Sequence, residues 1–532
     1  MKKVIPLFCT LLVAQLSIIF FFATKKNGLF IDEIWTYNLS NSYFNPFIGN
    51  ASKFFNTVLD GSFFYNSLTV QQNQIFSYAS VFASQAADVH PPLYYCLIHT
   101  ICSFFPNTFS IWFGLAPNIL FFVLVYFFIV AISYDITKNY IFSLASCLIY
   151  GFSLGAVSTV LIIRMYAMLT AIIMAVLYIH IKLIDDIYND LNFENIKYKL
   201  LILFLLYFCG FLTHYHFIIF AFIISLLFCL YVFLLKKYKI LYIYFIFTVT
   251  PILIGFLIFP AAYNHLFHGY RGVSSFNKDS LFSKLFIYNN FLDKELSHLL
   301  LFIIIIALIL YIIEKLFVIK IKKYRNNIAL NIILRTDNEV ILDNIKTNKM
   351  ILILTSLFTY LIIIKTAEIR DSRYIYILYP IISILYTYII YKMLEQINIK
   401  YIFICSIVLL TCINIKINLH SVNIKWLYND DSIIYNEIKK ENNPTFFAIT
   451  EKEEWWPVTY FVKYFAFAKN IILTTDDTFK KNIPVNRVLF VCTVRQKTED
   501  KKVIDFLMKE NNYTIVKQIA SDWHGKIYKL EK

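Results

Sequence analysis

This 532-residue sequence has little charge, little glycine and little proline. Asp, Glu, Lys and Arg make up 16% of the residues, hydrophobic residues make up 59%, and there are 11 glycines and 12 prolines. A soluble protein of this length carries a larger charged fraction on its surface. We find no internal repeat and no long linker rich in Pro, Gly or Ser. The composition therefore predicts a polytopic membrane protein.

The nine cysteines show no CxxC spacing. Most of them lie inside apolar runs, among them Cys9, Cys147, Cys209, Cys229, Cys405 and Cys412. Metal sites and disulfide frameworks built from cysteine depend on recognisable spacings, so we expect neither structural disulfides nor a cysteine metal site.

The formal net charge of +15 comes largely from lysines in short loops between apolar runs. Positive charge concentrated in such loops is typical of the cytoplasmic side of membrane proteins. We interpret the basic patches as orientation signals and expect no nucleic-acid partner.

The first apolar run, residues 4–23, is long enough to cross a bilayer and is interpreted as a retained signal-anchor helix. Residues 24–108 then form a large first outer loop with interfacial helices. Within that loop, the apolar piece 93–105 has only 13 residues and is expected to be interfacial or re-entrant. About eleven spans are predicted in all, the later ones at residues 109–134, 141–162, 165–181, 200–213, 217–235, 240–259, 299–313, 350–364, 374–391 and 401–413.

The charges select the orientation of these spans. With the N-terminus inside, the lysine cluster at residues 236–239 and the basic loop 314–349 both fall on the cytoplasmic side. Counting residues 93–105 as a span would place the basic loop outside. We therefore expect a multi-pass protein of the cytoplasmic membrane.

The composition changes near residue 419. Residues 1–418 are predicted to form an all-α membrane domain, and residues 419–532 a small soluble α/β domain on the extracytoplasmic side. The predicted helices of this second domain are 432–441 and 501–511, and its predicted strands are 445–450, 471–475, 487–494 and 513–521.

Six polar motifs are predicted to collect at the outer face of the membrane. They are Asp32-Glu33, Asp88-Val89-His90-Pro91-Pro92, Arg164-Met165-Tyr166, His214-Tyr215-His216, Tyr270-Arg271-Gly272 and Arg370-Asp371-Ser372-Arg373-Tyr374. Placement on one face favours a shared extracytoplasmic site.

The acid pair Asp32-Glu33 follows the first span directly. One interpretation is that the pair caps the next helix, because acids favour helix starts. The other is a carboxylate base that accepts a proton from an attacking hydroxyl, while the second acid orients it or binds the acceptor. Capping needs only one acid, which favours the second interpretation.

The basic residues of the motifs suit phosphate. His90, next to Asp88, could be protonated and bind a phosphate, or could be structural. Arg164 could extend to lipid headgroups, and the same alternative holds for Arg271, Arg370 and Arg373. Several guanidiniums around one carboxylate pair suit a phosphate or diphosphate leaving group.

The remaining motif residues are expected to lie near substrate: Tyr166, His214, His216 and Tyr374. The two histidines of THYH are two residues apart. A helical zinc pair needs a spacing of four, so no metal site is predicted.

The order of these motifs resembles the GT-C membrane glycosyltransferases of the protein O-mannosyltransferase and aminoarabinose-transferase type. The resemblance covers about residues 1–413 and rests on the acid pair after the first span, then HPPLYY, RMYA, THYHF and RYIYILYP in that order. It implies a sugar transferred with inversion from a polyprenyl-phosphate donor on the extracytoplasmic face.

By the same resemblance, Asp32 would be the general base and Glu33 its neighbour. His90, Arg164 and Arg373 would lie near the donor phosphate. The mannosyltransferases usually carry an acid shortly after the RMYA arginine, whereas residues 165–169 contain none. The acceptor therefore stays open among envelope glycan, lipid and protein.

The chemistry of the residues agrees with this expectation. A lipid-phosphate sugar has a good leaving group, so the enzyme needs a base and cations and requires no cofactor, although a divalent metal remains possible. The chain also lacks the DxD pattern of nucleotide-sugar enzymes. Two alternatives are a transporter or flippase of lipid-linked sugars, and an enzyme like the O-antigen ligases or polymerases. Charge-poor spans disfavour the first, and acids placed early in the chain disfavour the second.

Overall fold

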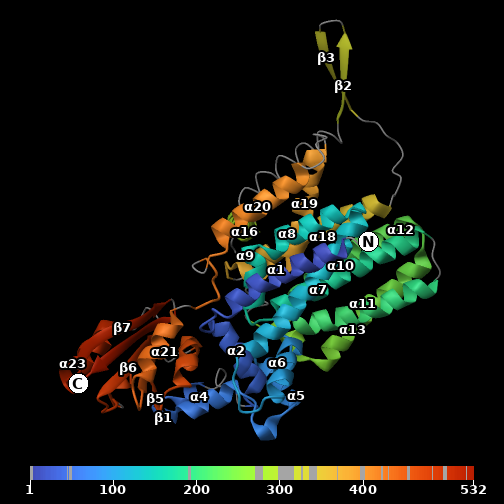
Figure 1. Ribbon diagram of the computed structural model, residues 1–532. Coiled ribbons are helices and arrows are strands. Elements are labelled where there is room, and N and C mark those ends of the chain that lie inside the picture. The colour runs from blue at the N-terminus through green and yellow to red at the C-terminus, as the bar shows by residue number, and fades with distance from the viewer. Residues whose placement is uncertain are drawn as a thin grey trace.

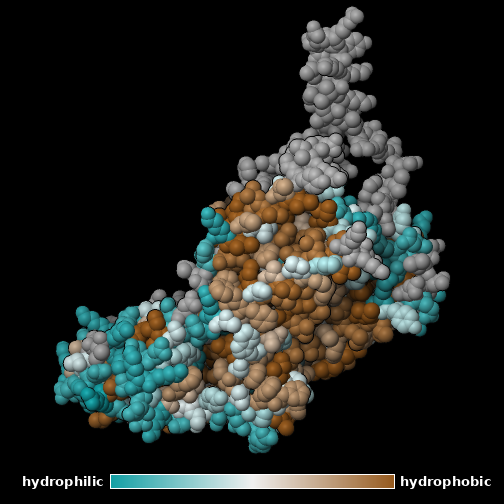
Figure 2. All heavy atoms as spheres, in the orientation of Figure 1, coloured by the Kyte–Doolittle hydropathy of each residue, from teal (hydrophilic) through white to brown (hydrophobic). Residues whose placement is uncertain are grey.

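The computed structural model describes residues 4–532 except 45, 47–50, 190–192, 270–279, 297–316, 325–326, 335–343, 368, 396–401, 421–422, 429, 452–455, 482, 495–499 and 523. Its main body is a bundle of apolar helices, and a small sheet domain lies at one end of that bundle (Figure 1). Hydrophobic side chains cover the visible face of the bundle, whereas the sheet domain is mostly hydrophilic (Figure 2). This distribution suits a body surrounded by lipid and a domain in water.

Within the described ranges, 8 helices are long and apolar enough to cross a membrane, or 9 if one bent pair is a single span. The helices of the bundle are α1 (Ile5–Ala23), α7 (Trp112–Thr137), α8 (Tyr140–Gly151), α9 (Leu154–Leu161), α10 (Tyr166–Tyr188), α11 (Phe193–Thr213), α12 (His216–Leu234), α13 (Tyr238–Ile258), α18 (Asn344–Thr366), α19 (Tyr379–Glu395) and the shorter α20 (Ile402–Asn418), with the 3-10 helix η3 (Ser372–Leu378) leading into α19. The predicted spans up to residue 259 each coincide with one or two of these helices. The same holds for the last three predicted spans, which begin at residue 350. The predicted span 299–313 lies outside the described residues.

One predicted span is broken. Residues 141–162 were expected to form a single helix, but α8 and α9 meet at an angle of 60°. Ser153 begins α9 by accepting a hydrogen bond from the Ala156 amide at 3.0 Å. Serine is a favoured residue at a helix start, so a second helix begins inside the apolar run at this point.

The first loop folds into short helices at the end of the bundle that faces the sheet domain (Figure 1). Its elements are α2 (Ile31–Asn41), η1 (Ala51–Phe54), β1 (Thr57–Asp60), α4 (Gly61–Leu68), η2 (Gln72–Gln74), α5 (Tyr78–Ala87) and α6 (Leu93–Ser103). As predicted, α6 is too short to be a candidate span, and it begins directly after the paired prolines. A proline at a helix start loses no hydrogen bond, because first-turn amides have no partner within the helix.

Between α13 and α18, the described residues form four further elements. They are α14 (Ala261–Phe267), α16 (Leu281–Leu296) and the hairpin strands β2 (Phe317–Tyr324) and β3 (Asn327–Leu334). The hairpin projects from the end of the bundle opposite the sheet domain (Figure 1).

The sheet domain contains α21 (Asp431–Lys439), β4 (Thr445–Thr450), η4 (Trp456–Phe461), α22 (Val462–Phe465), β5 (Asn470–Thr475), η5 (Phe479–Lys481), β6 (Val488–Val494), α23 (Asp500–Asn511), β7 (Thr514–Asp522) and β8 (Gly525–Glu531). The four predicted strands and both predicted helices are present, and β8 is an addition. The sheet order is β1-β5-β4-β6-β8-β7, with β4 parallel to its two neighbours.

The first strand of this sheet comes from the first loop. β1 pairs antiparallel with β5, so that Thr57 lies opposite Leu473. A six-stranded sheet therefore joins the loop that carries the acid pair to the C-terminal domain.

Candidate functional site

The break between α9 and α10 fixes one side of the site. Asn118 on α7 donates its side-chain amide to the carbonyl oxygens of Val160 and Ile162, at 3.0 and 2.8 Å. Glu33 on α2 accepts a hydrogen bond from the Ile163 amide at 2.7 Å. Buried backbone groups at a helix break need such partners. The first turn of α2 is thereby joined to the segment that precedes α10.

Glu33 is fully occupied by structural contacts. Its Oε2 accepts hydrogen bonds from the Phe30 amide at 2.6 Å and from Lys26 Nζ at 3.0 Å. Neither the Glu33 nor the Lys26 side chain is exposed. Burial lowers the pKa of Lys26, although Glu33 acts in the opposite direction. The capping role that the sequence offered for the pair thus belongs to Glu33, which also holds α2 in place.

Asp32 has different partners from Glu33. Its side chain contacts an arginine that comes much later in the sequence. Asp32 Oδ2 forms a salt bridge with Arg373 of η3, and the two side chains are 20% and 7% exposed. Asp371 Oδ1 accepts a hydrogen bond from the Arg373 main-chain amide at 3.1 Å, and Asp371 Oδ2 lies 4.0 Å from Arg373 Nε. Asp32 is the more accessible of the two acids.

Arg164 lies in the break before α10 and contacts residues of the first loop through both of its terminal nitrogens. Its NH1 donates to the main-chain oxygen of Asp32 at 3.2 Å, to Thr36 Oγ1 at 3.2 Å and to the Tyr95 hydroxyl at 2.8 Å. Its NH2 lies 3.3 Å from Nε2 of His90. Because arginine has no acceptor, His90 Nε2 accepts this bond and the ring proton is on Nδ1. The phosphate-binding role that the sequence suggested for His90 stays a prediction.

The Nδ1 proton of His90 is directed at Asp88 Oδ2, at 2.8 Å. Burial acts to raise the pKa of Asp88, but His90 and its hydrogen bond outweigh this effect and leave that pKa below its ordinary value. Asp88 therefore stays ionised and sets the orientation of the imidazole, as carboxylates do for functional histidines.

Aromatic rings line the cationic centre. Tyr166 lies 5.9 Å from His214, His214 lies 4.5 Å from His216, and His216 lies 5.6 Å from Tyr374, between ring centroids. His90 lies 6.0 Å from His214. The four residues expected near substrate are therefore brought together with His90.

Two guanidinium groups retain unused donors. The Nε atoms of Arg164 and Arg373 are buried and have no hydrogen-bond partner among the described residues. Buried donors in proteins nearly always find an acceptor. Each guanidinium therefore keeps one donor that no hydrogen bond among the described residues satisfies.

The predicted site residues fall into three groups. Asp32, His90, Arg164 and Arg373, with Tyr166, His214, His216 and Tyr374, come together. Glu33 is adjacent but buried. Arg370 is exposed, unlike Arg373, and Arg271 lies outside the described residues.

Sequence reasoning missed four contributors to the site. Tyr95 and Thr36 bind Arg164, Lys26 pairs with Glu33, and Lys425 Nζ lies 2.6 Å from Asp371 Oδ2. Tyr95 lies within the HPPLYY motif and could have been included for that reason. The other three are ordinary residues whose role depends on tertiary contacts.

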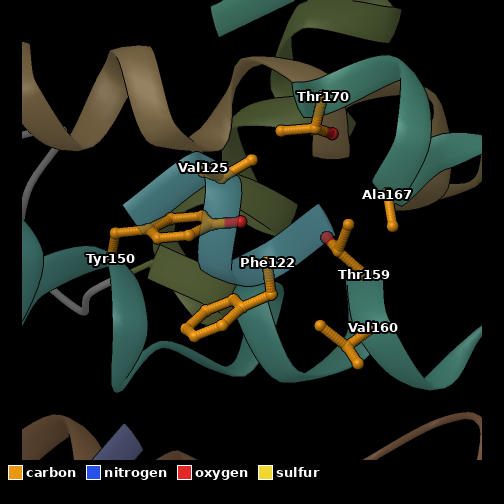
Figure 3. A pocket seen from close by; sticks show the side chains of 7 residues that line it. All are labelled: Phe122, Val125, Tyr150, Thr159, Val160, Ala167 and Thr170. Atoms are coloured by element: carbon orange, nitrogen blue, oxygen red, sulfur yellow. The ribbon is translucent and has the colours of Figure 1, made fainter. Parts of the chain in front are cut away.

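The pocket drawn in Figure 3 is separate from these residues. It lies among α7, α8, α9 and α10 and is lined by Phe122, Val125, Tyr150, Thr159, Val160, Ala167 and Thr170. The hydroxyls of Thr159 and Thr170 both donate to carbonyls of their own helices, at 2.7 Å. Its threonine hydroxyls are thus already used, and the pocket is a gap in helix packing.

Glu33→Gln is expected to lower the melting temperature of the detergent-solubilised protein. The change leaves the buried Lys26 ammonium without its counter-charge, a loss of about 3–5 kcal/mol for a buried pair. Glu437→Gln is the control. Its partners Lys440 and Lys517 are 63% and 54% exposed, and such pairs contribute little. Its third partner, Lys529 at 4.0 Å, keeps a closer acid, Glu441 at 2.8 Å. Equal melting temperatures for Glu33→Gln and wild type would show that the buried pair is not needed to hold α2.

A second buried acid, Glu295 on α16, lies behind η3. It accepts a hydrogen bond from the Tyr379 hydroxyl at 2.7 Å. Burial raises the pKa of Glu295 from its ordinary value of 4.5 to about 7, against the lowering effect of hydrogen bonds from Ser372 and Tyr379. The protonated form is therefore favoured by folding. The stability that the protonated Glu295 contributes is complete below about pH 4.5 and is lost as the pH rises to about 7.

Glu295→Gln, a neutral mimic of that protonated acid, should therefore raise the melting temperature more at pH 8.5 than at pH 5.5. About 1.5 of the 2.5 pKa units are lost between these two pH values, so the free-energy difference between the two conditions is about 2 kcal/mol, at 1.36 kcal/mol for each pKa unit. Thermal unfolding followed by size-exclusion chromatography at both pH values measures the effect. An equal change at both pH values would contradict the raised pKa.

The fold and the buried polar centre define a polytopic membrane protein with a polar site at one end of its helical bundle. Among the described residues there is no group of three or more His, Cys, Asp or Glu side chains placed to hold a metal ion.

No protein-family model matches the chain, and no curated protein matches it. Among solved structures, the apo crystal structure of ArnT from Cupriavidus metallidurans is similar, with 10% identity and a TM-score of 0.46 over 91% of this chain and 95% of that one. At this identity and TM-score the similarity carries no conclusion about activity.

Proposed function

We propose that this protein is a membrane glycosyltransferase of the GT-C type. It transfers a hexose or pentose from a polyprenyl-phosphate donor to a hydroxyl or amine of an envelope acceptor, with inversion at the anomeric carbon. The proposal rests on one observation above all: an accessible carboxylate, Asp32, contacts one buried guanidinium, Arg373, while a second, Arg164, binds the Asp32 main chain.

The proposed reaction assigns a role to each group. Asp32 accepts the proton of the acceptor hydroxyl as the acceptor oxygen bonds to the anomeric carbon, and the bond from that carbon to the phosphate oxygen breaks. Arg164 and Arg373 stabilise the charge that develops on the leaving phosphate. Donor binding draws Arg373 partly from Asp32 to the phosphate, which makes the carboxylate a stronger base. No cofactor is required in this scheme.

His90 supports the leaving phosphate in two ways. Its Nε2 accepts from Arg164, so the imidazole sets the direction of that guanidinium. When phosphate takes the Arg164 donor, Nε2 becomes available to bind a proton and add a further positive charge beside the anion. The ionised Asp88 on the opposite ring nitrogen favours that protonated form.

We place the site on the extracytoplasmic side of the cytoplasmic membrane. The support is the positive charge of the loops predicted to lie inside, such as Lys236 and Lys237 between α12 and α13. Helix α2, which carries the acid pair, and the sheet domain lie at the other end of the bundle from the β2–β3 hairpin, whose strands lie within the basic loop 314–349 (Figure 1).

A comparison of envelope material tests the proposal. Glycans, lipids and glycoproteins are profiled by mass spectrometry from a deletion strain complemented with wild type or with Asp32→Asn, at matched membrane abundance. The proposal expects one sugar modification to be present with wild type and absent with both the deletion and the variant. Identical profiles in all three strains would contradict the proposed function.

A further inference from the structure

Asp32 and Arg373 are separated by 341 positions in the sequence, yet they meet in a salt bridge. One short stretch of chain contacts the surroundings of both. It consists of residues Lys425 to Tyr428, between α20 and α21, and is called the junction segment below.

On the Asp32 side, the junction segment binds the loop that leads into α2. Lys26 Nζ donates to the Trp426 carbonyl at 2.6 Å, and the Asn27 amide donates to the Leu427 carbonyl at 2.8 Å. The ring of Trp426 lies 5.2 Å from that of Phe30, the residue before α2. The start of α2 therefore takes its position from the junction segment.

On the Arg373 side, the same segment binds η3. The Trp426 indole N–H donates to the Tyr376 hydroxyl at 3.2 Å, and Lys425 Nζ lies 2.6 Å from Asp371 Oδ2. Trp426 and Tyr376 have no exposed surface. A large, fully buried ring with one specific hydrogen bond has little freedom to shift, because protein interiors are closely packed.

The sheet domain fixes the segment from behind. Lys463 on α22 donates to the Leu29 carbonyl at 3.0 Å and forms a salt bridge of 2.6 Å with Asp431, and both side chains are almost completely buried. Gly28 also packs against Asp431 so closely that an added Cβ would lie 1.8 Å from the carboxylate. The loop before α2 is thus held between the junction segment and the sheet domain.

From these contacts we infer that Trp426 is a positioning residue for the proposed transfer reaction: it sets the alignment of Asp32 with Arg373, and so makes the C-terminal domain a required part of the transferase site. The inference rests on the proposed function. Displacements of about 1 Å at a reacting centre can cost a hundredfold in rate.

The test uses the full-length purified chain with polyprenyl-phosphate sugars and the acceptor identified in the envelope comparison. Trp426→Phe keeps a buried ring but removes the indole donor, and Tyr376→Phe removes the acceptor of the same bond. Each should lower the turnover number about tenfold, with the donor KM changed less than about twofold. The double variant should be no slower than Tyr376→Phe alone, because Tyr376→Phe already removes the bond with Trp426. Tyr376→Phe also removes the bond that the Tyr376 hydroxyl accepts from Ser372 at 3.3 Å, so the double variant is compared with this single variant.

Tyr126→Phe is the matched control. It removes a buried tyrosine hydrogen bond of 2.7 Å to the Phe8 carbonyl, inside the bundle and outside the site. Its turnover should equal that of wild type. Equal losses in the control, additive losses in the double variant, or wild-type turnover in Trp426→Phe would each overturn the positioning role. If Asp32→Asn also keeps full activity, the proposed function fails; if only Trp426→Phe does, the positioning role alone fails.

Discussion

Asp32→Asn is expected to lower the turnover of sugar transfer by about a thousandfold, within the range that a general base contributes. Asparagine has almost the same shape, so its carbonyl oxygen can still accept a hydrogen bond from Arg373, but the amide cannot accept the acceptor proton. Binding of polyprenyl phosphate alone should change little. Single-turnover kinetics and a binding titration on the purified protein separate the two effects.

Asp60→Asn is the matched control for that change. Asp60 is an exposed acid in the same first loop, where it caps α4 by accepting from the Ser62 amide at 2.8 Å. Asparagine caps helices as well as aspartate does, so this variant should keep full activity. A turnover of Asp32→Asn within a factor of about ten of wild type would be too fast for the loss of a general base. That result would show that Asp32 is not the base.

Arg373→Gln should have the second largest effect, a loss of about a hundredfold or more in kcat/KM for the donor. The change removes the cation that contacts Asp32 and that would stabilise the leaving phosphate, a term of roughly 3 kcal/mol for comparable electrostatic groups. Because the phosphate is also present before the reaction, the donor KM should rise as turnover falls. Initial rates over a range of donor concentration measure both.

Arg487→Gln provides the comparison for Arg373→Gln, because Arg487 is an exposed residue of the sheet domain. It should leave both parameters unchanged. Arg373→Gln with a normal donor KM and a normal turnover would show that the guanidinium at this position has no part in donor use.

The helical elements could be predicted well from the sequence, for a simple physical reason. A span must be long and apolar, and both properties are local, so runs such as residues 217–235 coincide with helices such as α12. The break between α8 and α9 was missed because it depends on Ser153 capping a helix inside a continuous apolar run.

In the sheet domain, β4 was predicted with its observed ends at residues 445 and 450, because it is a short apolar run of a buried strand. β8 was missed because its residues do not alternate regularly between polar and apolar, and β1 has only four residues in a polar loop. The partner of β1 is β5, more than 400 positions away. A strand defined mainly by such a partner cannot be recognised from its own residues.

The candidate site shows the same division. Asp32, His90, Arg164 and Arg373 could be proposed from motifs and topology, because each is a polar residue at a predicted helix end. The separate tasks of Asp32 and Glu33 could not, since they follow from which way each carboxylate points. Trp426 could not be proposed either, because its contacts with the loop before α2 and with η3 exist only in the folded chain.

The strand pairing between β1 and β5 also orders events in time. β1 is synthesised before all but the first of the candidate spans, yet β5 emerges only after the last of them. Pairing between segments so far apart in the chain is slow, and nascent chains fold the parts already made first. β1 therefore has no strand partner until β5 has been synthesised. A chain that terminates early in the sheet domain would be inserted in the membrane and yet lack a finished site.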